Sequence, residues 1–174
     1  ASQALTSTLD LDEVIATLLE EIRKMMDVAA ASVWLNDPET NELVCWQATG
    51  PQTDMVRGWR LAPSQGVTAW VAESSKPPIV SDASGDERHY RLIDEKTALP
   101  FRSNLTIPLR TKRGVIGTLQ VMDTQVDRFS PADLTIIEPL AAAAAIAIEN
   151  ARLYEQAQRD AETKSILLRE VNHR

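Results

Sequence analysis

The sequence predicts an α+β protein: a central antiparallel sheet with helices on both faces, extended by a long C-terminal coiled-coil helix. Three observations predict this class. Two segments in the middle of the chain have the composition and turn signals of β-hairpins. An amphipathic helical pattern precedes the first hairpin. A helical pattern that contains no glycine, and no proline after Pro139, follows the second hairpin to the C-terminus.

The length and charge of the chain limit its function. The 174 residues fit one globular domain plus an extension. Lys and Arg number 18 against 25 Asp and Glu, so the net charge is −7, and we expect no nucleic-acid binding, which needs a basic face. No unbroken apolar run approaches about 18 residues and no signal peptide is visible, so we expect no membrane insertion. The single cysteine, Cys45, fits a reducing, cytoplasmic location.

The N-terminal half carries the first helix and the first hairpin. Apolar residues from Leu11 to Met26 recur at i, i+3, i+4 and i+7, which predicts an amphipathic helix. Ser32–Leu35 and Glu42–Gln47 are β-rich and flank the turn cluster Asp37–Asn41, so they predict a hairpin. Shorter elements are predicted beyond it: an extended segment at 56–61, a helix at 67–73 and a strand at 79–81.

The second hairpin is predicted at 103–110 and 115–122, around the turn 111–114. If Arg110 pairs with Val115, strict alternation assigns each side chain to a face. Neither face is then plainly polar, so both should be covered by other elements. One face carries Leu105, Ile107, Leu109, Ile116, Thr118, Gln120 and Met122, and the other carries Asn104, Thr106, Pro108, Gly117, Leu119 and Val121.

The last helix begins with Ser130 as a capping residue and Pro131 in the first turn. Alternating steps of three and four residues define a heptad seam along it. The helix is too long for one small domain to cover, so its second half should leave the globule and form a parallel homodimer. The seam consists of Ile137, Leu140, Ala144, Ala147, Ala151, Tyr154, Gln158, Ala161, Ser165, Leu168 and Asn172.

The order of these segments resembles a GAF domain. The motifs that carry the resemblance, over about residues 5–156, are Leu9–Val14, Gly66–Trp70, Ser103–Arg110 with Gly114–Leu119, Phe129–Leu134 and Ile146–Tyr154. The resemblance implies a sheet with the terminal helices on one face and a pocket for a small molecule on the other. It also implies a sensor domain at 1–156, followed at 157–174 by a signalling helix and the start of a dimerisation and phosphotransfer helix.

The tail, Ile166–Arg174, is similar to the phosphoacceptor box of sensor histidine kinases of the HWE and HisKA_2 type. The similarity implies that His173 accepts a phosphoryl group from ATP, with Glu170 one turn earlier as an orienting acid. The implied function is the sensory module of a two-component histidine kinase. ATP, Mg²⁺ and the response regulator would then engage the full-length kinase, so we expect no enzymatic activity from this chain alone. The alternative for His173 is a solvated histidine at a helix end.

The resemblance also suggests residues for the ligand pocket: Trp70, His89, Tyr90, Thr118 and Gln120. A core tryptophan and a surface-loop histidine are the structural alternatives for Trp70 and His89. The ligand itself stays unknown, and no metal-ligand cluster is visible. The alternative function is a GAF-fold photoreceptor, or a small-molecule-binding dimerisation module, without kinase output.

Three ligand or reaction classes known for GAF domains can be compared with the sequence. Covalent bilin is not expected, because Cys45 lies in the first hairpin and not near His89 and Tyr90. One cysteine does not match the several used by GAF-type methionine sulfoxide reductases. Of the cyclic-nucleotide signature N-K…F-x-x-x-D-E, the chain keeps only Phe129 and Asp133, which we interpret as helix-start residues.

Overall fold

The computed structural model describes residues 8–51, 53–62, 79–80 and 101–172. A sheet of six strands in the order β3-β2-β1-β6-β5-β4 forms the centre, and every neighbouring pair is antiparallel. The elements are α1 (Thr8–Met26), β1 (Ala30–Asn36), β2 (Leu43–Thr49), α2 (Thr53–Val56), β3 (Arg60–Leu61), β4 (Ile79–Val80), β5 (Ser103–Thr111), β6 (Gly114–Asp123) and α5 (Pro131–Asn172).

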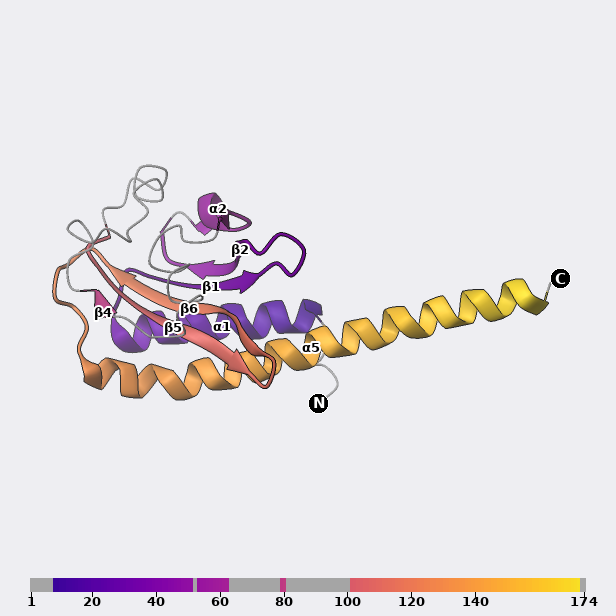
Figure 1. Ribbon diagram of the computed structural model, residues 1–174. Helices are drawn as coiled ribbons and strands as arrows, with labels where there is room; N and C mark the ends of the chain where they lie inside the picture. Colours follow the sequence, from indigo (N-terminus) through magenta and orange to yellow (C-terminus); the bar gives the residue numbers. More distant parts are fainter. Residues whose placement is uncertain (1–7, 52, 63–78, 81–100, 173–174) are drawn as a thin grey trace.

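The long helices α1 and α5 cover one face of the sheet, and the single-turn helix α2 lies on the other side (Figure 1). The apolar stripe of α1 is buried against the sheet, which confirms the predicted first helix and the α+β class. Both predicted hairpins form, as β1–β2 and β5–β6. The extended segment at 56–61 is confirmed only as β3, because α2 ends at Val56. The strand predicted at 79–81 is confirmed over Ile79–Val80 as β4, whereas Ser81 and the helix predicted at 67–73 lie outside the described residues.

The predicted faces of the second hairpin are wrong in register. Arg110 does pair with Val115, but a β-bulge follows, and Leu109 pairs with Gly117. Ile116 is the extra residue, and one extra residue exchanges the faces of all residues beyond it. Leu119 and Val121 therefore join Leu105, Ile107 and Leu109 in the core beneath the helices. Thr118, Gln120 and Met122 share the opposite face with Asn104, Thr106 and Pro108.

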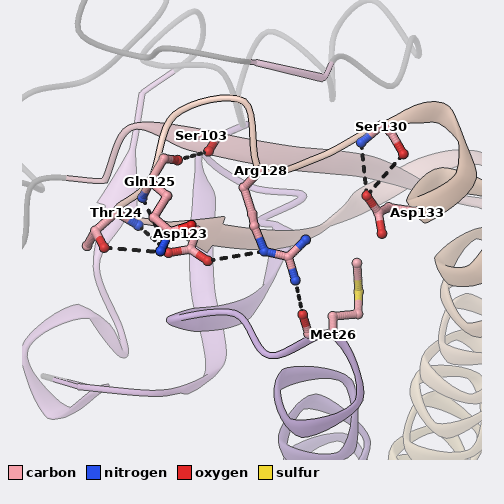
Figure 2. Close-up of polar contacts among 8 residues, drawn as sticks. All are labelled: Met26, Ser103, Asp123, Thr124, Gln125, Arg128, Ser130 and Asp133. Carbon is pink, nitrogen blue, oxygen red and sulfur yellow. Dashed lines mark hydrogen bonds and ion pairs between the residues drawn. The ribbon is translucent and has the colours of Figure 1, made fainter.

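The connection from β6 to α5 is fixed by side chains (Figure 2). The Asp123 carboxylate accepts the amide N–H groups of Thr124 and Gln125 at 2.7 and 3.4 Å. Arg128 lies 3.6 Å from Asp123 and donates to the carbonyl of Met26, at the end of α1. The loop between β6 and α5 is thus tied to both β6 and α1.

Helix α5 begins as predicted, with Ser130 before Pro131. The Asp133 carboxylate accepts the Ser130 amide at 2.9 Å, in the manner of a capping box. From Gln156 to Asn172 every residue is exposed, and this half projects away from the globule (Figure 1). The first half of the predicted seam is already covered within the monomer. Ile137, Ala144 and Ala151 are buried against the sheet. The exposed part of α5 begins only beyond Ala151.

The expectation of no membrane insertion stays a prediction, because α5 passes a length and composition test for a membrane span. One 18-residue window of α5 has a mean hydropathy of 1.5, so by length and composition alone this helix could cross a membrane. A test for unbroken apolar runs misses it, because a few polar residues interrupt the window. In the structure, 28% of that window is buried. Core helices of globular proteins pass the same test, and α5 contributes to the core beneath the sheet.

Candidate functional site

The face of the sheet opposite the long helices carries a buried group of uncharged polar residues. The register aligns Ser32 of β1, Gln120 of β6 and Thr106 of β5 in one row across three strands. Asn104 and Thr118 lie on the same face, in neighbouring rows. All five are buried. Buried polar groups in the middle of a sheet require partners, so this group, the polar face, is a candidate ligand site.

Hydrogen bonds within the polar face satisfy part of it. Gln120 Nε2 donates to Thr106 Oγ1 at 3.0 Å, and Thr106 Oγ1 donates to Asn104 Oδ1 at 3.2 Å. The Trp34 indole donates to Ser32 Oγ at 3.0 Å. The Asn104 amide N–H groups have no partner among the described residues. These hydrogen bonds make the Asn104 side-chain oxygen an acceptor. The amide N–H groups of Asn104 remain available to donate to another group.

Thr118 is the clearest unsatisfied member of the polar face. Its side chain is 0% exposed, and its hydroxyl has no hydrogen-bond partner among the residues that the structure describes. The register places it between Trp34 of β1 and Pro108 of β5, neither of which can accept a hydrogen bond through its side chain. A buried hydroxyl without a partner is destabilising, so it marks a position where a ligand atom or a water would bind.

A cavity of about 30 Å³ opens beside this group. Its lining includes Ser32 and Gln120 of the polar face and the neighbouring Trp34. Phe101 and Val56 form apolar walls. A water needs about 10–15 Å³ by this kind of measure, so the space is water-sized. The polar face therefore has a small unfilled volume between an indole, an amide and a hydroxyl.

Cys45 lies on the same side of the sheet but is not a reactive group. It is buried with Trp34, Leu43 and Leu61 in a small apolar cluster. Burial raises the pKa of its thiol from 9.0 to about 12, although the nearby charge of Arg57 opposes this. A thiol with so high a pKa contains almost no thiolate at neutral pH and is a poor nucleophile.

The predicted site residues fall into three groups. Thr118 and Gln120 lie together on the polar face, and their role as pocket residues stays a prediction. Glu170 is exposed near the end of α5. Trp70, His89, Tyr90 and His173 lie outside the described residues.

Sequence reasoning missed Ser32, Asn104 and Thr106 as site residues. The available signal was the presence of Asn and Thr within a strongly β-forming segment, but the assumed register placed Asn104 and Thr106 on the other face from Gln120. The remnants of the cyclic-nucleotide signature have structural roles, as predicted. Phe129 is buried in the core, and Asp133 caps α5.

Comparison with known proteins agrees with this fold. Residues 8–149 match the family described as GAF domain. The chain is 31% identical over 127 residues to a dual 3',5'-cyclic-AMP and -GMP phosphodiesterase 11 of Drosophila melanogaster, covering 72% of this chain and 9% of that protein. It is 23% identical over 167 residues to a probable 3',5'-cyclic phosphodiesterase of Caenorhabditis elegans, covering 91% of this chain and 23% of that protein.

A solved GAF domain from a phosphoenolpyruvate-protein phosphotransferase of Coxiella burnetii superposes with a TM-score of 0.77 at 19% identity, covering 89% of this chain and 92% of that one. This likeness shows the fold. The family match extends over most of the chain, so the chain belongs to the GAF domain family of sensory, small-molecule-binding modules. It spans less than a quarter of the length of the two phosphodiesterases.

Proposed function

We propose that this chain is the sensory module of a cytoplasmic two-component histidine kinase, which binds a small molecule on the polar face and relays its binding through α5 to His173. The observation that carries this proposal is the continuity of α5. One helix packs beneath the sheet through Ile137, Ala141 and Ile148 and continues without a break to Asn172, the residue before His173.

The chemistry of the polar face favours a ligand held by hydrogen bonds. The described residues of this face are uncharged, and they offer an amide donor at Asn104 and a hydroxyl at Thr118. The buried, high-pKa thiol of Cys45 gives no support to a covalent tether such as that of bilins. Cyclic AMP and cyclic GMP are the first compounds to test, because phosphodiesterases are among the relatives, but we expect no binding without the signature residues.

Strand β5 is the physical link between pocket and helix. Thr106 and Pro108 lie on the side of the polar face, whereas Ile107 and Leu109, which alternate with them along β5, are buried in the core that α5 covers. A ligand that displaces β5 therefore acts on residues packed against α5. Only different affinities for two arrangements of the helix would let the ligand act, and couplings of about 1–3 kcal/mol are usual.

Neutral imidazole is a good phosphoryl acceptor near neutral pH, which supports His173 as the output residue, with Glu170 orienting the ring. ATP and Mg²⁺ would be supplied by the catalytic domain of the full-length kinase, and a response regulator would accept the phosphoryl group. The isolated chain should therefore remain unlabelled with radioactive ATP. With a matching ATP-binding domain added, label should appear on the chain, and His173→Gln should abolish it.

A parallel homodimer through α5 is part of this proposal. Beyond the globule the helix exposes large apolar side chains, among them Ile166, Leu167, Leu168 and Val171, each more than half exposed. Such a stripe tends to associate. Sedimentation should show a dimer, and deletion of residues 156–174 should weaken it more than it destabilises the globule. A chain that stays monomeric at high micromolar concentration contradicts this part.

The decisive experiment interrupts helix α5 between the polar face and His173. Two glycines inserted after Gln156 lower helix propensity by about 1 kcal/mol each and shift the heptad phase by two residues. In the full-length kinase, this variant should bind ligand normally, while ligand no longer changes autophosphorylation. Regulation that survives the insertion would contradict relay through α5. If ligand binds but no kinase output exists, the chain is instead a small-molecule-binding dimerisation module.

A further inference from the structure

A second cavity, of about 300 Å³, lies on the other side of the sheet from the polar face. It is placed where α5 leaves the globule, between the start of α1, the β1–β2 hairpin and α5, and we call it the exit cavity. Its volume is at the lower end of the range for small-molecule sites. Its lining consists of Leu11, Leu35, Asn36, Asp37, Pro38, Val44, Trp46, Ile148, Ala151, Arg152 and Glu155.

The floor of the exit cavity is apolar. Leu11, Leu35, Ile148 and Ala151 come from three different elements and are buried in the main core. Trp46 forms one wall, because a β-bulge between Val33 and Trp34 makes Trp46 the extra residue of β2. An indole beside aliphatic side chains favours an apolar group of a ligand.

The charged residues at the rim differ in how fully they are paired. Asp37 is satisfied: its carboxylate accepts from Arg60 at 2.8 Å and from the Glu39 amide at 2.9 Å, and these bonds lower its pKa. Arg152 and Glu155 form no ion pair or hydrogen bond with the part of the chain that the structure describes. The Arg152 residue as a whole is exposed, but desolvation of its guanidinium at the cavity lowers its pKa, although the charges of Asp37 and Glu155 oppose this.

We propose that the exit cavity binds an α-amino acid with an apolar side chain. Arg152 and Glu155 are three residues apart on α5, so their side chains emerge on neighbouring positions of one helix face. One is a cation and the other an anion, and both line the cavity together with its apolar floor. A zwitterion complements this arrangement: its carboxylate accepts from Arg152, its ammonium donates to Glu155, and its side chain packs against Trp46 and the floor.

Neither Arg152 nor Glu155 is a position of the proposed dimer seam, which uses Tyr154 in this region, since Ala151 is already buried within the monomer. The exit cavity is therefore compatible with a dimer. A ligand there would touch α1, the first hairpin and α5 together, at the last turn of α5 that the globule covers. Ligand binding in the exit cavity would thus affect α5 where the helix leaves the globule, independently of ligand binding on the polar face.

The test uses isothermal titration calorimetry with L-leucine and three analogues that each lack one recognition group. The analogues are 4-methylpentanoate without the ammonium, 3-methylbutylamine without the carboxylate, and glycine without the side chain. L-leucine should bind, and each analogue should bind at least about tenfold more weakly, because each loses a charge-assisted bond or the apolar contact. An analogue that binds as tightly as L-leucine overturns the proposal, as does the absence of L-leucine binding below about 10 mM.

Matched variants test whether Arg152 and Glu155 bind the charged groups of the amino acid. Arg152→Gln and Glu155→Gln should each weaken L-leucine binding about tenfold or more. Arg159→Gln and Glu162→Gln, on the exposed part of α5 outside the cavity, are the controls and should bind as the wild type does. Circular dichroism checks that all four variants keep their helix content. Equal affinity of the cavity variants and the controls contradicts the assignment.

A spectroscopic readout separates the two sites. With 5-fluorotryptophan incorporated, the chain gives four ¹⁹F signals, from Trp34, Trp46, Trp59 and Trp70, and Trp46→Phe assigns one of them. L-leucine should shift the Trp46 signal and leave the Trp34 signal of the polar face unchanged. Thr118→Val should leave L-leucine affinity unaltered. A shift of Trp34 instead of Trp46 would place the amino acid on the polar face and overturn the proposal.

Discussion

Asp123 and Arg128 lie 3.6 Å apart and connect the end of the central strand β6 to the loop that starts α5. The same guanidinium donates to the carbonyl of Met26 and lies 5.7 Å from the centre of the Phe129 ring. One side chain thus joins the sheet, the end of α1 and the start of α5, the three elements whose relative positions a signal through α5 would change.

Replacing Arg128 by Met should destabilise the fold by about 2 kcal/mol, because the charged hydrogen bond and the contact with Phe129 are both lost at a partly buried site. Urea denaturation monitors the change. Arg113→Met is the matched control. Arg113 pairs with Glu149 at 3.8 Å but is 67% exposed, so its loss should change stability by less than about 0.5 kcal/mol. Equal effects would mean that the Arg128 contacts contribute no more than a surface ion pair.

Thr118→Val should stabilise the ligand-free protein by about 1 kcal/mol, since it removes a buried hydroxyl that has no partner. Thr106→Val should do the opposite and destabilise by about 1–2 kcal/mol, because it breaks the hydrogen bonds to Gln120 and Asn104. Thermal denaturation of both variants without ligand shows whether each substitution raises or lowers the stability of the fold. A destabilising Thr118→Val would show that the hydroxyl is satisfied in solution and is not waiting for a ligand.

Gly117→Ala should be far more harmful than Gly114→Ala in the same strand. A Cβ atom at Gly117 would lie 2.0 Å from the Trp34 carbonyl oxygen and 3.0 Å from Leu35 Cα, and backbone in the middle of a sheet cannot move away. We expect a loss of about 3 kcal/mol or more. At Gly114 nothing lies within 4 Å, and only its φ of +110° opposes a side chain, for about 1–2 kcal/mol. Urea midpoints of the two variants check the order.

Glu20 predicts a specific acid sensitivity. Hydrogen bonds from Arg23 and then from Thr49 lower the pKa of Glu20 from 4.5 to about 2. A carboxylate whose pKa is lowered by folding stabilises the fold above its unfolded pKa, and this contribution is lost as pH falls through the folded value. The stability difference between wild type and Glu20→Gln should therefore be constant above about pH 5 and shrink between about pH 4.5 and 2.

Denaturation series at several pH values measure that difference. The neighbouring Glu21 is exposed and forms no hydrogen bond within the described part of the chain, so Glu21→Gln is the control and should follow the wild-type curve. A Glu20→Gln difference that stays constant down to pH 2 would contradict a lowered pKa in the folded state.

Local patterns predicted the elements well. The stripe from Leu11 to Met26, the two turn clusters and the Ser130-Pro131 start each specify an element through residues close in sequence. The predicted pairing of Arg110 with Val115 is confirmed as well, because it is set by the turn. Thr118 and Gln120 were placed in the pocket through the family resemblance, and they do lie on the polar face.

Features that depend on distant contacts were not predictable. Pro108 indicates an edge position or a bulge in this hairpin, but it does not fix the extra residue at Ile116. That position alone decides which residues share a face with Gln120. The heptad pattern could not show that Ala144 and Ala151 pack against the sheet, since the same small residues suit a coiled coil. The exit cavity gathers Leu11, Trp46 and Arg152 from three elements, and no spacing in the sequence relates them.

The exposed half of α5 also sets a length scale. From Gln156 to Asn172 the helix extends for about 25 Å at 1.5 Å per residue. If α5 relays a signal as proposed, this half of the helix acts as a lever with its pivot beside Ala151 and Glu155. A tilt of about 5° at that pivot would move the far end by about 2 Å, which is comparable to the helix shifts that carry signals across subunit interfaces. A small tilt of α5 at the pivot would thus become a larger displacement at the end of the helix.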